Sequence, residues 1–150
     1  MFTGLPTATV RVLQRGAPDS YGHPPERHTS DGEGNPCRHC LRMIEEGAAM
    51  LVLAHRPFER SHAYAETRPI FLHARECEPF TGEGVPEIAV SPRYLLRGYG
   101  ADERIVYGTG GVVEREALAE RAAELPARDD VAFVDMRSAS NNCWQARVVD

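Results

Sequence analysis

Two cysteines separated by two residues, Cys37 and Cys40, form the densest group of reactive side chains in this sequence. The Cys-x-x-Cys spacing brings two sulfur atoms close enough to form a small disulfide loop or to bind one soft metal ion. A thioredoxin-type redox pair needs a strand before the motif and a helix after it, whereas a loop rich in proline and glycine precedes Cys37. A c-type haem site is excluded, because Leu41 follows Cys40 where that motif requires histidine.

A second pair of metal-binding residue types, His73 and Cys77, stands four residues apart at the end of an expected strand. Joined to the first pair, it would complete a closed tetrahedral Cys₃His zinc site, with His39 as an alternative ligand. Such a site requires the donor atoms to lie within about 5 Å of one another, because Zn–S and Zn–N bonds are about 2.0–2.3 Å long. The competing interpretation makes the cysteines small buried thiols and His73 a hydrogen-bonded strand residue.

The fourth cysteine, Cys143, shares one face of another expected strand with Gln145 and Arg147, and these residues alternate with Trp144, Ala146 and Val148. A neighbouring guanidinium favours the thiolate, so a cysteine nucleophile paired with a histidine is one hypothesis for this position. Arg97 and Tyr99 share one parity of a further strand and, together with Arg147, could bind a carboxylate or a phosphate. The alternative is that these arginines are solvated side chains on a strand face.

All 17 basic residues of the 150-residue chain are arginine, because the sequence contains no lysine. Schiff-base chemistry, a P-loop lysine and a lysine general base are therefore excluded. The net charge of −5 and the scattered arginines argue against nucleic acid or an anionic membrane as a partner. The first residues carry neither a signal peptide nor a lipidation motif, which predicts a cytoplasmic protein whose four cysteines are free thiols, metal ligands or a redox pair.

The elements that must position these side chains predict an α+β fold, a single domain over residues 1–150 with a largely antiparallel sheet. One main helix is expected over residues 114–125, because apolar residues recur there at helical spacing before Pro126. A short helical turn is expected over residues 41–46. Strands are expected over residues 7–13, 48–55, 69–74, 94–99, 104–107, 131–136 and 143–149.

The connections between these elements include a long irregular loop over residues 14–36, which contains four prolines and four glycines. A loop of this length inside a domain is a lid, a binding loop or a mobile insert. Residues 100–103 are expected to join the strands 94–99 and 104–107 as a hairpin. Residues 108–111 are expected to form a glycine-rich turn into the helix, since they lack the spacing of a phosphate-binding loop.

Several short motifs follow one another in a fixed order: Gly4-Leu5, Pro36-Cys37-Arg38, Pro69-Ile70-Phe71, R-x-L-x-R-x-Y over residues 93–99, and Asn142-Cys143-Trp144. This order resembles the bacterial family catalogued as domain of unknown function 1203, over essentially the whole chain. The resemblance implies a single-domain cytoplasmic protein without an established activity. The family pattern has glycine where this sequence has Arg68 and Asn142, and glycine adopts positive φ more readily than other residues.

The resemblance also bears on the cysteines, because Cys37 and Cys143 match motif positions of the family whereas Cys40 is particular to this branch. It favours a shared pocket lined by Cys37, Arg38, Arg97 and Cys143. The first hypothesis is therefore a protein that binds a small polar or anionic ligand through Cys37, Arg38, Arg97, Tyr99, Cys143 and Arg147. The alternative is a zinc- or thiol-dependent enzyme or redox sensor that uses Cys37, Cys40, His73 and Cys77.

Overall fold

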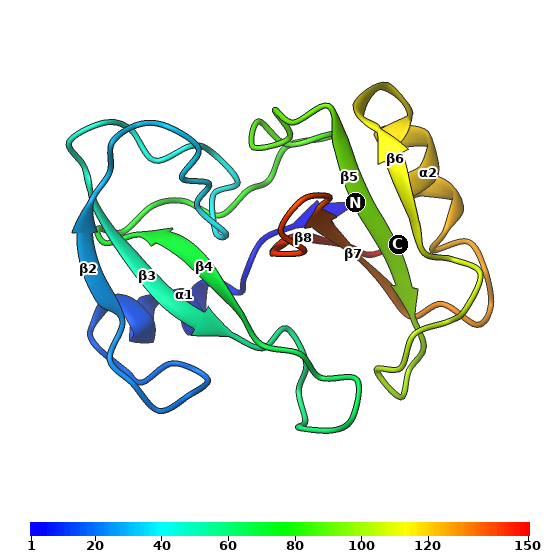
Figure 1. Ribbon diagram of the computed structural model, residues 1–150, viewed down its shortest axis with the longest axis horizontal. Coiled ribbons are helices and arrows are strands. Elements are labelled where there is room, and N and C mark those ends of the chain that lie inside the picture. Colours follow the sequence, from blue (N-terminus) through cyan, green and yellow to red (C-terminus); the bar gives the residue numbers. More distant parts are fainter.

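Two antiparallel sheets and two short helices make up the fold, and the computed structural model describes all of residues 1–150 (Figure 1). The expected α+β class with largely antiparallel pairing is confirmed. In chain order the elements are β1 (Phe2–Thr3), α1 (Thr7–Gln14), β2 (Glu26–Thr29), β3 (Ala49–His55), β4 (Arg68–His73), β5 (Arg93–Tyr99), β6 (Gly111–Glu114), the 3₁₀ turn η1 (Arg115–Ala117), α2 (Leu118–Glu124), β7 (Phe133–Ser138) and β8 (Trp144–Val148).

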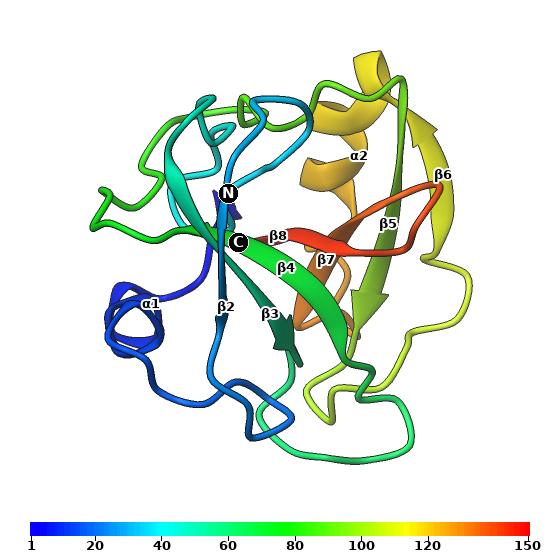
Figure 2. The ribbon, with the colours of Figure 1, turned by 60° about the vertical axis from the view of Figure 1, so that its left-hand side comes forward.

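The larger sheet has five strands in the order β1-β8-β7-β5-β6. Alternate residues of its strands point to one face, where they pack against α2 and form the first hydrophobic core. Figure 2 shows α2 lying beside β5 and β6 on this face. The fully buried side chains of this core include Leu96, Leu118, Leu125, Val134 and Met136.

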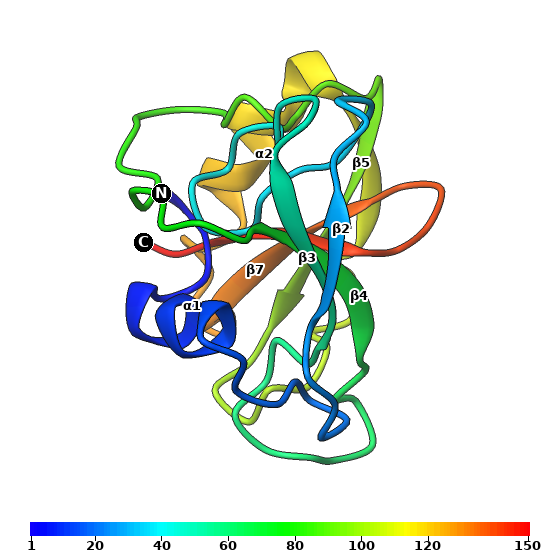
Figure 3. The ribbon, with the colours of Figure 1, turned by 90° about the vertical axis from the view of Figure 1, so that its left-hand side faces the viewer.

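The smaller sheet has three strands in the order β2-β3-β4 and carries the second hydrophobic core. Leu51 and Leu53 of β3 and Ile70 and Leu72 of β4 are buried there with residues of α1. The two sheets meet where β4 contacts β8. Figure 3 shows the N- and C-termini side by side, as the pairing of β1 with β8 requires.

Residues 7–13 form the helix α1, so the strand expected there is wrong. Val10 and Leu13 are buried three residues apart on one side, and this amphipathic packing outweighs the β-propensity of the valines and threonines. The helix ends in a Schellman motif at Gly16, whose φ is 98°: its N–H donates to Leu13 O, and the next N–H donates to Val12 O.

The loop expected over residues 14–36 contains a regular element, because residues 26–29 form β2 and pair with β3. All four side chains of β2 are exposed. An edge strand of this kind is held by backbone hydrogen bonds and shows no hydrophobic alternation. The remainder of the segment is irregular, as its prolines and glycines predict.

The hairpin partner of β5 is β6, and the strand expected over residues 104–107 is absent apart from one bridge between Tyr99 and Ile105. The glycine-rich turn over residues 108–111 therefore leads into a strand and not directly into the helix. The expected helix over residues 114–125 is shorter, since η1 precedes α2. Glu103 adopts a φ of 62°, which breaks extended pairing on the return segment after β5.

A β-bulge between Met136 and Arg137 changes which core the residues of β8 enter. Ala146 lies opposite Met136 and packs in the first core, whereas Trp144 lies opposite Arg137 and packs in the second. The expected alternation along β8 buries Trp144, Ala146 and Val148, but the bulge separates Trp144 from the other two.

Neither helix is long and apolar enough to cross a membrane.

Candidate metal centre

The Cys-x-x-Cys motif forms a tight turn held by its own backbone. Leu41 N–H donates to Cys37 O at 3.0 Å, and Cys37 N–H donates to Arg42 O at 2.9 Å. Leu41 adopts a φ of 53°, a left-handed conformation that is unusual for a branched side chain. No helix follows Cys40, so the helical turn expected over residues 41–46 is wrong, and the pair lacks the helix N-terminus that activates thioredoxin-type cysteines. Instead, the chain turns back and Met43 bridges to Pro36.

This turn is docked on the end of β4. Arg38 N–H donates to Phe71 O at 3.0 Å, and the His73 N–H donates to the sulfur of Cys37 at 3.4 Å. A backbone N–H directed at a cysteine sulfur stabilises the thiolate form that a metal requires. The docking therefore carries the two cysteines of the turn to the strand that bears His73.

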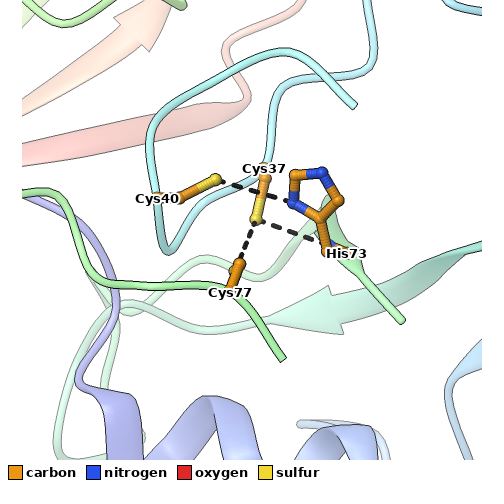
Figure 4. A group of neighbouring side chains, drawn as sticks. All are labelled: Cys37, Cys40, His73 and Cys77. Carbon is orange, nitrogen blue, oxygen red and sulfur yellow. Dashed lines mark hydrogen bonds between the residues drawn. The ribbon is translucent and has the colours of Figure 1, made fainter. Parts of the chain in front are cut away.

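The four predicted metal ligands lie together, with one donor atom each and all within 4.8 Å of one another: Cys37, Cys40, His73 and Cys77 (Figure 4). The Sγ atoms of Cys37 and Cys77 are 3.9 Å apart, and Cys40 Sγ lies 3.5 Å from His73 Nδ1. A tetrahedron with metal–sulfur bonds of about 2.3 Å has edges of about 3.8 Å. The cluster thus has the dimensions of a four-coordinate metal site and is close enough to hold a metal ion.

The ring of His73 is oriented by Glu45, a residue that the sequence did not indicate. Nε2 of His73 lies 3.0 Å from Glu45 Oε2, and Nδ1 faces the sulfur of Cys40. A carboxylate that accepts the outer N–H of a metal-ligating histidine fixes its tautomer and raises its basicity. Such a partner could not be found by spacing alone, because it depends on how the segment after the turn runs back past β4.

His39, the alternative ligand, is buried beside the cluster and contacts Cys77. Its Nδ1 lies 3.2 Å from Cys77 Sγ and its Nε2 lies 2.9 Å from Thr7 Oγ1. Burial lowers the pKa of His39, which favours the neutral ring. With Nε2 beside the hydroxyl of Thr7 and Nδ1 beside the sulfur of Cys77, His39 links the cluster to α1.

Hydrogen bonding within the cluster separates the acidities of its groups. Hydrogen bonds from Cys40 and Cys77 lower the pKa of Cys37. The pKa of Cys77 is raised by its hydrogen bond with Cys37. The pKa of His73 is raised to about 11 by hydrogen bonds to Cys37 and Cys40. Because four donor groups are packed into a small volume, the protonation of each depends on the others. A bound divalent cation would neutralise the negative charge of their thiolates.

A cavity of about 750 Å³ opens beside the cluster. Cys40, His73 and Cys77 line it, whereas Cys37 is fully buried behind them. A metal ion or a chelator can therefore reach Cys40, His73 and Cys77 from this side.

The residues expected to bind a small ligand fall into three separate places. Arg38 and Cys143 line one pocket of about 240 Å³, together with hydroxyl and amide side chains. Cys37 does not line this pocket, because its thiol belongs to the metal cluster. Arg38 is 3% exposed, and its guanidinium donates to Trp144 O at 2.8 Å and to Pro36 O at 2.6 Å.

Arg97, Tyr99 and Arg147 lie instead on the face of the larger sheet that is turned away from α2. Arg97 donates to Tyr99 Oη at 2.8 Å and pairs with Glu66 at 2.6 Å. Arg147 donates to both oxygens of the buried Asp135, at 2.8 and 3.2 Å. The charges of these two arginines are thus paired within the protein.

Arg137 belongs to the same face and was not indicated by the sequence. Its side chain is fully buried, and Nη1 lies 3.1 Å from Glu66 Oε1. Nε and Nη2 have no hydrogen-bond partner. Arg137 shares the face of Asp135, two residues earlier in β7, and strand parity alone gave no sign that this face is covered.

The fold and the cluster define an α+β protein with a Cys₃His set at the edge of its smaller sheet. The chain matches the family described as protein of unknown function (DUF1203) over residues 34–149, and it belongs to that family. The matched region includes all four cluster residues as well as Arg38 and Cys143. No curated protein and no solved structure matches the chain.

The two positions where glycine is expected from the family pattern behave differently. Asn142 adopts a φ of 57°, so it keeps the left-handed conformation that glycine would adopt. Asparagine is one of the few other residues that tolerate it. Arg68 begins β4 with a negative φ, so no glycine is needed there.

Proposed function

We propose that this protein binds one zinc ion through Cys37, Cys40, His73 and Cys77. The observation that carries the proposal is the approach of three thiols and one imidazole nitrogen to within 4.8 Å of one another. Sulfur and nitrogen donors in a tetrahedral arrangement select zinc over calcium or magnesium, which prefer oxygen. Four protein ligands leave no open coordination position, which is typical of a structural site.

The ion would connect three segments directly: the turn at residues 37–40, the end of β4 and the loop that holds Cys77. Because zinc binds the folded site and not the dispersed ligands, its binding free energy contributes to folding. We therefore assign the zinc ion the task of fixing the turn on which Arg38 lies. The cysteines require a reducing compartment, which agrees with the expected cytoplasmic location.

Metal analysis combined with thiol titration tests this proposal. The purified protein is expected to contain about one zinc per chain and to present one reactive thiol, that of Cys143, to a thiol reagent. After removal of zinc with a chelator, all four thiols should react. The Cys143→Ser variant is the matched control and should show none before and three after chelation. Metal-free protein with four freely reacting thiols would refute the proposal.

A second function, binding of a small anionic ligand, is favoured by a different observation. Arg38 is buried in the wall of a pocket, and no carboxylate lies within 4.0 Å of its guanidinium. A buried cation without a counter-ion is destabilising, and a bound anion would compensate it. We propose that the pocket of Arg38 and Cys143 takes such an anion.

Thermal unfolding in the presence of succinate tests this second function. Succinate should raise the midpoint temperature of unfolding of the wild-type protein and should not raise that of Arg38→Gln. Arg42→Gln is the matched control, because Arg42 is an exposed arginine of the same turn. Equal shifts in all three proteins would show that the anion acts without Arg38.

A further inference from the structure

Cys143 is the one cysteine outside the metal cluster, and it lies in a pocket of its own. The residue is partly exposed, and its Sγ makes only a long contact of 3.8 Å with Asn141 O. It follows the turn between β7 and β8, where the left-handed Asn142 directs the chain into the strand. The thiol is therefore accessible from the pocket and is not engaged by a metal ligand set.

The side chain that distinguishes this thiol from an ordinary surface cysteine is Arg38. Its guanidinium is held 2.8 Å from the carbonyl oxygen of Trp144, the residue that follows Cys143. An arginine guanidinium is cationic at neutral pH, so Arg38 places a positive charge in the wall of the pocket that Cys143 also lines.

The rest of the wall supplies both hydrogen-bonding groups and apolar surface. Hydroxyl and amide groups come from Ser91, Ser138, Ser140, Asn141 and Gln145. Apolar surface comes from Phe71, Ile88 and Val90. A volume of about 240 Å³ admits a short chain that has an anionic end near Arg38 and a sulfur near Cys143.

We propose that Cys143 is a site of mixed-disulfide formation with a small thiol compound that bears a carboxylate. This inference rests on the proposed anion-binding function and names its ligand class. The Cys143 thiolate attacks one sulfur of a small disulfide, RSSR; the bond Cys143–S–S–R forms, the S–S bond of the reagent breaks, and RS⁻ leaves. Cys143 is oxidised and one half of the reagent is reduced, and the proton lost by Cys143 is available to RS⁻. The carboxylate of R pairs with Arg38.

Three reagents in which two methylene groups separate the sulfur from the end group test the role of the carboxylate: 3,3′-dithiodipropionate, bis(2-hydroxyethyl) disulfide and cystamine carry an anionic, a neutral and a cationic end. Zinc-loaded full-length protein is treated with each, and intact-protein mass spectrometry follows the adduct. The rate of each reagent with the protein is divided by the rate of the same reagent with a small free thiol. This normalisation cancels the different intrinsic reactivities of the three disulfides. We expect dithiodipropionate to exceed cystamine by about tenfold, because a charge-assisted hydrogen bond contributes about 1.4 kcal/mol.

The overall charge of the protein strengthens the test, because a net charge of −5 by itself attracts cystamine and repels the carboxylate reagent. The preference should disappear in Arg38→Gln and persist in Arg42→Gln, both checked for bound zinc. If Arg38→Gln does not fold, competition in the wild-type protein replaces it: succinate should slow dithiodipropionate and leave the cystamine rate unchanged.

Normalised rates that are equal for the three reagents or that favour cystamine, with no effect of succinate, overturn the proposal. If succinate still stabilises the wild-type protein through Arg38 in thermal unfolding, anion binding stands and only the disulfide inference fails. If succinate has no Arg38-dependent effect in either experiment, both fail.

Discussion

The carboxylate of Glu45 lies 3.0 Å from Nε2 of His73, while the other ring nitrogen of His73 faces the thiols of the cluster. This pair joins the segment after the Cys-x-x-Cys turn to the end of β4. It gives His73 the orientation that a metal ligand needs.

Replacement of Glu45 is expected to weaken zinc binding without abolishing it. In Glu45→Ala the outer N–H of His73 loses its acceptor, and loss of such a partner lowers metal affinity by about 10–100-fold. Competition against a chromogenic chelator measures the affinity. Glu46→Ala is the matched control, because Glu46 is its exposed neighbour. Equal affinities of the two variants would contradict an orienting role for Glu45.

The left-handed backbone at Asn142 predicts that alanine and glycine at this position differ in their effect on stability. Asn142→Ala and Asn142→Gly both remove the contact with Glu66, so their difference isolates the backbone conformation. Alanine pays for positive φ and glycine does not, so Asn142→Ala should be less stable by about 1 kcal/mol. Urea unfolding of the zinc-loaded variants checks this, and equal stabilities would mean that the turn relaxes to another conformation.

The buried ion pair of Asp135 with Arg147 predicts a large effect of a small change. Asp135→Asn leaves Arg147 and the fully buried Arg137 without this counter-charge, which should cost about 3 kcal/mol. Asp130→Asn breaks an exposed pair with Arg128 and should leave stability unchanged within error. Urea unfolding compares the two. A similar small effect in both would show that water enters the site of Asp135.

His55 predicts part of the acid sensitivity of folding. Burial, followed by the charge of Arg147, lowers the pKa of His55 to about 4, whereas an unfolded histidine titrates near 6.5. Below pH 6.5 His55 therefore binds a proton in the unfolded chain, whereas in the folded chain it stays neutral until the pH approaches 4. This contribution to stability is complete above about pH 6.5 and is lost as the pH falls toward 4, by up to about 2 kcal/mol at pH 5.

The variant His55→Phe should lack this component. Zinc loss on acidification affects both proteins, so the quantity to compare is the difference between their unfolding free energies at pH 7.5 and pH 5. The wild-type protein should lose more stability than the variant over this interval. Parallel pH profiles would indicate that His55 takes up its proton in the folded state.

The cluster of Cys37, Cys40, His73 and Cys77 was predictable because the residue types and local spacings of metal ligands are themselves the signal. The spacing of Cys37 and Cys40 dictates one turn, and the expected strand over residues 69–74 ends where β4 delivers His73. Glu45 was not predictable, because its contact depends on the left-handed turn at Leu41 and the path of the chain behind it. Long-range contacts of this kind have no signature in periodicity.

Two secondary-structure predictions, the strand over residues 7–13 and the irregular loop over residues 14–36, are wrong where tertiary contacts outweigh local propensity. The β-branched residues of residues 7–13 suggested a strand, but Gly16 supplies the stop signal of a helix and Val10 pairs with Leu13 on its buried side. In β2 a strand forms where none was expected. Its four exposed side chains show no alternation, and only the pairing with β3 defines the strand. Tertiary packing decided both cases against local propensity.

The separation of the predicted ligand-binding residues also has a structural cause. Arg97 and Arg147 share a face of the larger sheet, where Glu66 and Asp135 pair with them. Arg38 reaches the other end of β8 because it is carried by the Cys-x-x-Cys turn. The parity of a strand predicts a shared face, but it does not predict which carboxylates a distant loop brings to that face.

Zinc K-edge X-ray absorption of the purified protein tests the central claim most directly. We predict a first shell of three sulfur atoms at about 2.3 Å and one nitrogen at about 2.0–2.1 Å, with the sulfur count falling to two in Cys40→Ser and unchanged in Cys143→Ser. A shell of oxygen and nitrogen without sulfur, or the same shell in Cys40→Ser as in the wild-type protein, would contradict the assignment of Cys37, Cys40, His73 and Cys77 as the metal centre.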